Sequence, residues 1–198
     1  MGRRAGYALL VALVLALLGA AGASVAGAAA PVWKLDGNPP TGTEKIIARA
    51  VDEQFVIPGL TTECAHATMV LGVTNRTSFA DAEVEEFLNE GCATEAGSKC
   101  HVERFEAKKL PWPAHRVTVS GKEYLVLEDV HIEARYSGSE CAFAGETVTV
   151  KGSAGGLIEN TTETITFDKA TASATGTSLK VGSSAVEWDA LFLAEGIG

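Results

Sequence analysis

Residues His115–Tyr136 read HRVTVSGKEYLVLEDVHIEARY, and this stretch decides the fold class of the 198-residue chain. Two runs that alternate apolar and polar residues, HRVTVS and EYLVLE, flank Gly121 and Lys122, which is the pattern of a β-hairpin. The following run, DVHIEARY, alternates with the same period of two. The stretch therefore predicts antiparallel strands that bury one face and expose the other.

The same rhythm continues towards the C-terminus, where short alternating runs are separated by Gly, Ser, Thr and Asn. We expect strands at Glu146–Lys151, Leu157–Asn160, Thr162–Asp168, Ser178–Val181 and Ala185–Phe192. The GSAGG stretch between the first two is interpreted as a hairpin turn with positive φ. Short strands at close spacing favour an all-β fold, either an antiparallel β-sandwich or an open barrel.

The N-terminal half leaves more than one interpretation open. Glu44–Ile57 fits a helix or a strand, whereas Cys64–Thr74 looks extended. Ser78–Gly91 fits a helix with Ser78 as its N-cap, or a strand.

The segment KKLPWPAH, residues 108–115, is the candidate for an internal boundary. One interpretation is a linker or an exposed aromatic binding element. We favour a rigid crossover whose Trp112 packs into the core, because two prolines stiffen the chain on either side of that ring.

Residues 1–28 have the organisation of a secretory signal peptide. Two arginines precede the apolar run YALLVALVLALL, and a small-residue stretch then offers cleavage sites after Ala23 or Ala28. The alternative is a retained membrane anchor, since the uncharged stretch is long enough to span a bilayer. We expect cleavage and a single secreted β-rich domain over residues 29–198.

The four cysteines, Cys64, Cys92, Cys100 and Cys141, all lie in the exported part. An even number in an oxidising compartment predicts two disulfides, and the spacings match no zinc-ligand pattern. Of the three possible pairings we favour Cys92 with Cys100 and Cys64 with Cys141. The alternative is a thiol nucleophile at Cys64 with His66 as its base, for which the sequence offers no third, orienting group.

The net charge and the absence of common motifs narrow the range of possible functions. With 16 Lys and Arg against 25 Asp and Glu, the formal charge is −9, which disfavours nucleic acid and anionic membrane surfaces as partners. The sequence contains no G-x-S-x-G, H-E-x-x-H, P-loop or G-x-G-x-x-G motif. We therefore expect no catalytic, cofactor-binding or metal-binding residues.

The most specific polar cluster is Asp129, His131, Glu133 and Arg135, which share one face of a predicted strand. Two such neighbours could hold a metal ion, or a carboxylate could orient His131 as a base. The alternative function is therefore a small secreted hydrolase or metal-dependent enzyme that uses Asp129, His131 and Glu133. We favour a solvated face with cross-strand ion pairs.

Several segments carry a resemblance: LPW at 110–112, GSAGGLIEN at 152–160, TITF at 164–167 and SLKVGSSAVEW at 178–188. With these the chain resembles a group of uncharacterised secreted proteins from high-GC actinobacteria. The Ala- and Gly-rich composition of the chain also indicates a bacterial source. The resemblance implies export, an all-β fold and a strand before Cys92. It implies no activity and transfers no functional residue.

Together these features predict a secreted, acidic, non-catalytic module of the extracellular space or cell envelope, with a binding or structural role. We expect an extracellular or cell-envelope partner, no nucleic acid, and no membrane contact after signal cleavage. A secreted inhibitor or interaction protein is a further alternative.

Overall fold

The structure is a computed structural model that describes residues 33–75 and 80–197. Its strands and its one described helix are β1 Glu44–Ile57, β2 Leu60–Asn75, β3 Ala80–Thr94, β4 His101–Ala107, β5 Trp112–Val119, β6 Lys122–Ser137, β7 Thr147–Glu159, β8 Thr164–Phe167, α2 Lys169–Thr175, β9 Leu179–Val181 and β10 Ser184–Ala194. The predicted all-β, disulfide-linked fold is confirmed. The predicted signal peptide lies outside the described residues.

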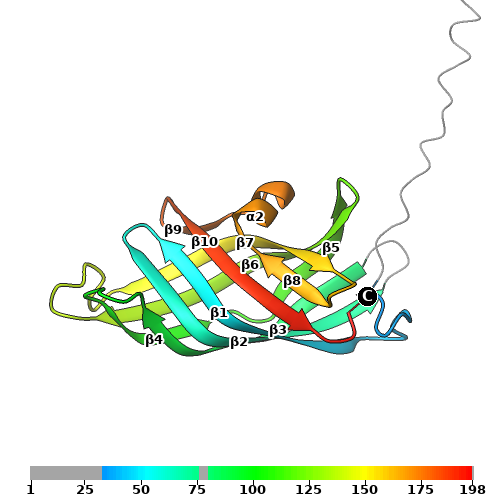
Figure 1. Ribbon diagram of the computed structural model, residues 1–198, viewed down its shortest axis with the longest axis horizontal. Helices are drawn as coiled ribbons and strands as arrows, with labels where there is room; N and C mark the ends of the chain where they lie inside the picture. Colours follow the sequence, from blue (N-terminus) through cyan, green and yellow to red (C-terminus); the bar gives the residue numbers. More distant parts are fainter. Residues whose placement is uncertain (1–32, 76–79, 198) are drawn as a thin grey trace, which may run out of the picture.

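The strands form one antiparallel sheet that closes on itself (Figure 1). Around the barrel, β6 is followed by β5, β3, β2, β1, β10, β8 and β7, and β7 pairs with β6 again. Of the two predicted architectures, the structure is therefore a barrel, and the pairing of β6 with β7 closes it.

Two places in the barrel wall are each shared by two short strands. On one side, β4 and β5 lie end to end along β6. On the other, β8 and β9 both bridge β7 and β10, and the chain between them leaves the wall as α2 (Figure 1). The wall is continuous elsewhere, because β1 and β2 are long strands with partners on both sides.

The alternation in β6 is confirmed on the inner face. Val130, Ile132, Ala134 and Tyr136 are each at most 2% exposed and lie in the core. The outer face differs from the prediction, because His131 is only 6% exposed. The expected solvated face is therefore wrong at this residue.

The GSAGG stretch lies inside β7, so the predicted hairpin turn is wrong. Gly152 does have a positive φ of 136°. A Cβ on Gly155 would lie 2.0 Å from Oγ1 of Thr175 in α2, and one on Gly156 would lie 2.8 Å from the ring of Phe167. These two glycines allow a helix outside the wall and an aromatic ring inside it to approach the strand closely.

Both ambiguous N-terminal segments are strands, β1 and β3, so the helix interpretation is wrong over the described part of Ser78–Gly91. Ser78 itself lies outside the described residues. The extended segment Cys64–Thr74 is confirmed within β2. Trp112 is fully buried, as predicted, and its Nε1 donates a hydrogen bond to the carbonyl of Lys108 at 2.8 Å.

The two disulfides join Cys64 to Cys92 and Cys100 to Cys141, so the favoured pairing is wrong. The register of β2 and β3 explains the first bond, because Cys64 stands directly opposite Cys92 with their Cα atoms 3.9 Å apart. The second ties the start of β4 to the loop after β6.

Aromatic rings fill the centre of the barrel. The ring of Trp188 stacks on that of Phe167 at 4.3 Å and on that of Phe55 at 5.4 Å. Phe87 meets Trp188 edge-on at 5.6 Å, and Phe105 lies 5.0 Å from Phe55. Residues from β1, β3, β4, β8 and β10 thus share one aromatic core.

Candidate functional site

A helix that the sequence analysis missed covers one of the two divided places in the wall. The side chain of Asp168 accepts a hydrogen bond from the backbone N–H of Thr171 at 2.7 Å, and the Thr171 hydroxyl accepts one from the Asp168 N–H at 2.9 Å. Gly176 ends the helix in the left-handed region. The signal was present in the sequence DKATASATG, as an N-cap, an Ala-rich stretch and a C-cap Gly.

α2 is held over the wall at both of its ends. Thr175 packs directly against Gly155 of β7, where no side chain intervenes. At the start of the helix, Lys169 forms an ion pair with Glu187 of β10. The helix therefore bridges β7 and β10 across the space between β8 and β9.

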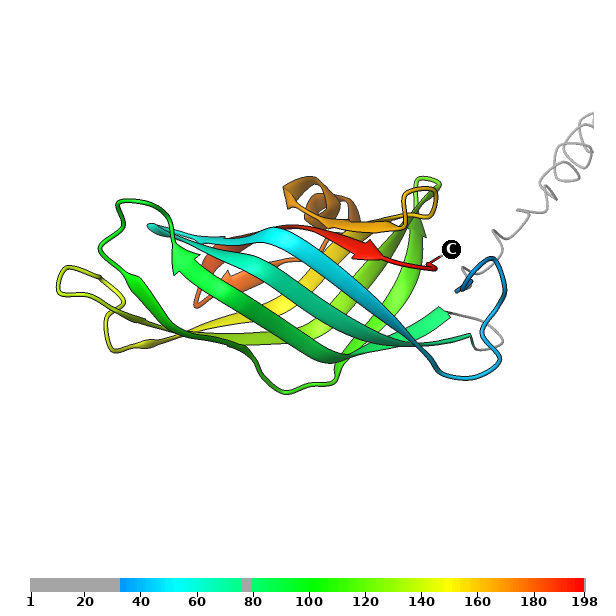
Figure 2. The same cartoon turned by 60° about the horizontal axis from the view of Figure 1, so that its bottom comes forward.

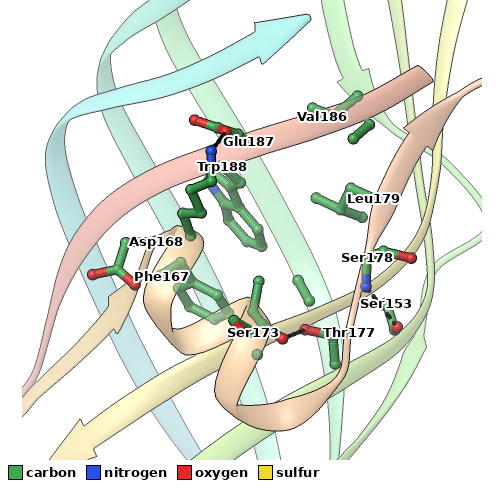
Figure 3. Close-up of a pocket in the computed structure, with 15 residues that line it drawn as sticks. Ser153, Phe167, Asp168, Ser173, Thr177, Ser178, Leu179, Val186, Glu187 and Trp188 are labelled. Atoms are coloured by element: carbon green, nitrogen blue, oxygen red, sulfur yellow. Dashed lines mark hydrogen bonds and ion pairs between the residues drawn. The ribbon is translucent and has the colours of Figure 1, made fainter.

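A pocket of about 310 Å³ lies beneath α2 (Figure 3). Its inner lining is apolar and consists mainly of Ala154, Phe167, Ala172, Leu179, Val186 and Trp188. Polar and charged side chains also line it: Ser153, Asp168, Lys169, Ser173, Thr177, Ser178 and Glu187. We call this space the α2 pocket.

Two stacked rings form the aromatic part of the α2 pocket. Phe167 from β8 and Trp188 from β10 are nearly parallel, with an interplanar angle of 18°. The indole Nε1 of Trp188 donates a hydrogen bond to Oε1 of Glu53 at 2.7 Å. Because its polar atom is satisfied on the barrel side, Trp188 offers the pocket only carbon surface.

Glu53 is the most unusual group in the core. It is fully buried, and its second carboxyl oxygen, Oε2, has no hydrogen-bond partner in the described part of the chain. Burial raises the pKa of Glu53 to about 8, and the hydrogen bond from Trp188 offsets part of this effect. Glu53 is therefore mostly protonated at neutral pH, and it fixes the orientation of Trp188.

The predicted polar cluster on β6 is only partly assembled. Nε2 of His131 lies 3.6 Å from Oε1 of Glu133. Asp129 has a φ of +52° in a bulge that interrupts the pairing of β6 with β7, so it leaves the shared face. Arg135 pairs with Glu103 at 3.2 Å. Among the described residues, no three His, Cys, Asp or Glu side chains are grouped as metal ligands.

The alternative interpretation of Cys64 as a thiol nucleophile is wrong. Cys64 forms a disulfide, and every cysteine of the chain is paired. His66 lies exposed on the outer face of β2, whereas Cys64 points into the core.

Sequence reasoning missed all the residues that line the α2 pocket and the carboxyl group behind it. Trp188, Phe167 and Ala154 come from different strands, and only the closed barrel brings them together. For Glu53 a weak signal existed, since it precedes the buried Phe55 by two positions and so shares its face.

Comparisons with protein-family models, with curated proteins and with solved structures find no match. No helix in residues 33–75 and 80–197 is long and apolar enough to cross a membrane.

Proposed function

We propose that this protein is a secreted, non-catalytic binding barrel that holds a small, flat, apolar molecule in the α2 pocket. The observation that carries the proposal is the stacked pair of Phe167 and Trp188 in a pocket whose inner lining is apolar. Phe55 covers the other face of Trp188, so an aromatic ligand gains apolar burial and contacts with the edges of these rings.

Size and lining support a small-molecule ligand. A volume of about 310 Å³ lies at the lower end of the range for small-molecule pockets, which suits a ligand of two or three rings. The serine and threonine side chains around the pocket can orient a single polar substituent. The wall strands and the capped helix provide a preformed site, which reduces the entropy lost on binding.

The disulfides support an extracellular location. Two disulfides and the absence of a free cysteine are typical of proteins that fold in an oxidising compartment. A compact barrel with a preformed pocket fits a protein that captures or carries a small compound outside the cell.

Titration with N-phenyl-1-naphthylamine, whose emission rises in apolar surroundings, tests the proposal. Ala172 lines the α2 pocket, so Ala172→Phe should fill the pocket and abolish saturable binding. Ala174 is exposed on the same helix and does not line the pocket, which makes Ala174→Phe the matched control.

The wild type and Ala174→Phe should bind the probe alike, with binding lost only in Ala172→Phe. Equal binding by all three proteins would place the probe elsewhere and overturn the proposal. The absence of saturable binding to the wild type by this probe and by smaller aromatic compounds such as 1-naphthol would do the same.

A further inference from the structure

The second divided place in the barrel wall is open on the β3 side. β3 pairs with β5 only from Asp81 to Val84. Beyond Val84, β3 continues to Thr94 along β2, but no ladder joins it to β4 among the described residues. β4 instead pairs with β6 (Figure 2).

The link between β4 and β5 keeps this side of the wall open. The backbone N–H of Lys108 donates to the carbonyl of His131 in β6 at 2.7 Å. The Lys108 carbonyl accepts the hydrogen bond from Trp112 described above. The first bond holds the link against β6, and the second holds it against the buried ring of Trp112. Neither bond draws the link towards β3. The opening is therefore a built feature of the wall.

A cavity of about 370 Å³ occupies this opening, and we call it the β3–β4 cavity. Its aromatic lining comes from Phe87 of β3 and Phe105 of β4, whose rings belong to the barrel core. Leu88, Ala107 and Leu110 complete the apolar surface. The edge-on contact between Phe87 and Trp188 lies between this cavity and the α2 pocket, so the two sites are separate.

Asn89 gives the cavity its chemical character. It stands opposite the buried Ala67 in the register of β2 and β3, so its side chain points inward. Both Oδ1 and Nδ2 are buried, and neither has a hydrogen-bond partner in the described part of the chain. A buried amide without partners destabilises a fold, and a leucine of similar size would avoid that cost. Asn89 therefore points to a ligand.

We propose that the β3–β4 cavity binds a small planar molecule with a primary amide or lactam group. Both amide atoms of Asn89 are closed to solvent in this structure, so the side chain turns towards the cavity when the ligand enters. The ligand N–H then donates to Oδ1 of Asn89, and the ligand carbonyl accepts from Nδ2. The ring of the ligand lies against Phe87 and Phe105. This site is distinct from the α2 pocket and takes a different class of compound.

The charges at the mouth favour a neutral ligand. Glu86 and Glu106 both line the cavity. The hydrogen bond from Lys108 holds the pKa of Glu106 below its ordinary value, so this carboxyl group is ionised. A carboxylate ligand would have the right shape for Asn89 but would carry no donor for Oδ1 and would meet negative charge at the mouth.

Benzamide is the probe that tests the proposal, with benzoate as the charged comparison. In ¹H–¹⁵N spectra of the wild type, benzamide should shift the side-chain NH₂ signals of Asn89 saturably, and benzoate should not. Asn89→Leu should lower the affinity for benzamide about tenfold or more, because two hydrogen bonds are lost. The same variant should be at least as stable as the wild type.

Asn38→Leu is the matched control, since Asn38 is exposed in a turn and does not line the cavity. It should leave benzamide binding unchanged, as should Ala172→Phe, which separates this proposal from the α2 pocket. Equal benzamide affinity in wild type and Asn89→Leu would overturn the proposal. So would a wild-type spectrum in which benzamide moves no Asn89 signal, an outcome that does not depend on the variant folding.

Discussion

The two openings in the barrel wall have the same origin and different linings. Each arises where one place in the sheet is divided between two short strands, β8 and β9 or β4 and β5. The first is covered by α2, and its inner lining is apolar. The second has no helix over it and contains the unpartnered amide of Asn89. A divided strand thus creates an opening, and the residues around the opening give it its chemical character.

The removal of one disulfide at a time should give the largest difference between the two openings. Cys100–Cys141 holds the start of β4, whereas Cys64–Cys92 crosslinks two paired strands. The loops span 41 and 28 residues. Replacing both cysteines of either bond by alanine should therefore cost about 4 kcal/mol of unfolding free energy, measured in urea.

Only the loss of Cys100–Cys141 should also weaken benzamide binding, because β4 forms one side of the β3–β4 cavity. Binding of the naphthyl probe to the α2 pocket should persist in this variant. If both ligands weaken equally, the openings are not independent.

The carboxyl group behind Trp188 should make stability depend on pH. In the unfolded chain Glu53 loses its proton near its ordinary pKa of 4.5, whereas burial in the fold raises the pKa to about 8. The folded state therefore binds more protons between these values, and stability falls as pH rises through this window. The fall between pH 4.5 and pH 7 should be about 3 kcal/mol.

Glu53→Gln keeps an oxygen acceptor for Trp188 and cannot ionise. It should match the wild type near pH 4.5 and exceed its stability increasingly towards pH 8, as measured by urea unfolding across this range. A constant stability difference between the two proteins at every pH would show that Glu53 is not the titrating group.

Lifting α2 from the wall should alter only the first opening. Gly155→Ala places a Cβ against Oγ1 of Thr175, so the helix or the strand must shift. We expect a loss of about 1–3 kcal/mol in stability and weaker binding of the naphthyl probe, with benzamide binding unchanged. Gly42→Ala is the control, because a Cβ there would contact nothing within 4 Å. Retention of full probe affinity by Gly155→Ala would mean that α2 does not shape the pocket.

Features that depend on local sequence pattern could be predicted from the sequence alone. The alternation of Val130, Ile132 and Ala134 correctly placed one face of β6 in the core, and the hairpin at Gly121 was correct. These features are local because a strand's period of two and a tight turn need only neighbouring residues.

Features that depend on strand register could not be predicted from the sequence. Cys64 faces Cys92 only because β2 and β3 pair in one register, and the sequence admits other pairings. Alternation could place Asn89 on a face, but not beside an opening in the wall. Gly155 and Gly156 resembled a turn, whereas their role is to admit Thr175 and Phe167 from outside and inside the wall.

The most direct test of the account is a titration of ¹⁵N-labelled protein with 1-naphthol, observed at the indole Nε1–H signals of the tryptophans. Trp188 lines the α2 pocket, whereas Trp33 and Trp112 are fully buried and line neither opening. The account predicts a saturable shift of the Trp188 signal, with the other two unchanged. A Trp188 signal that stays fixed while 1-naphthol binds elsewhere, or does not bind, would contradict it.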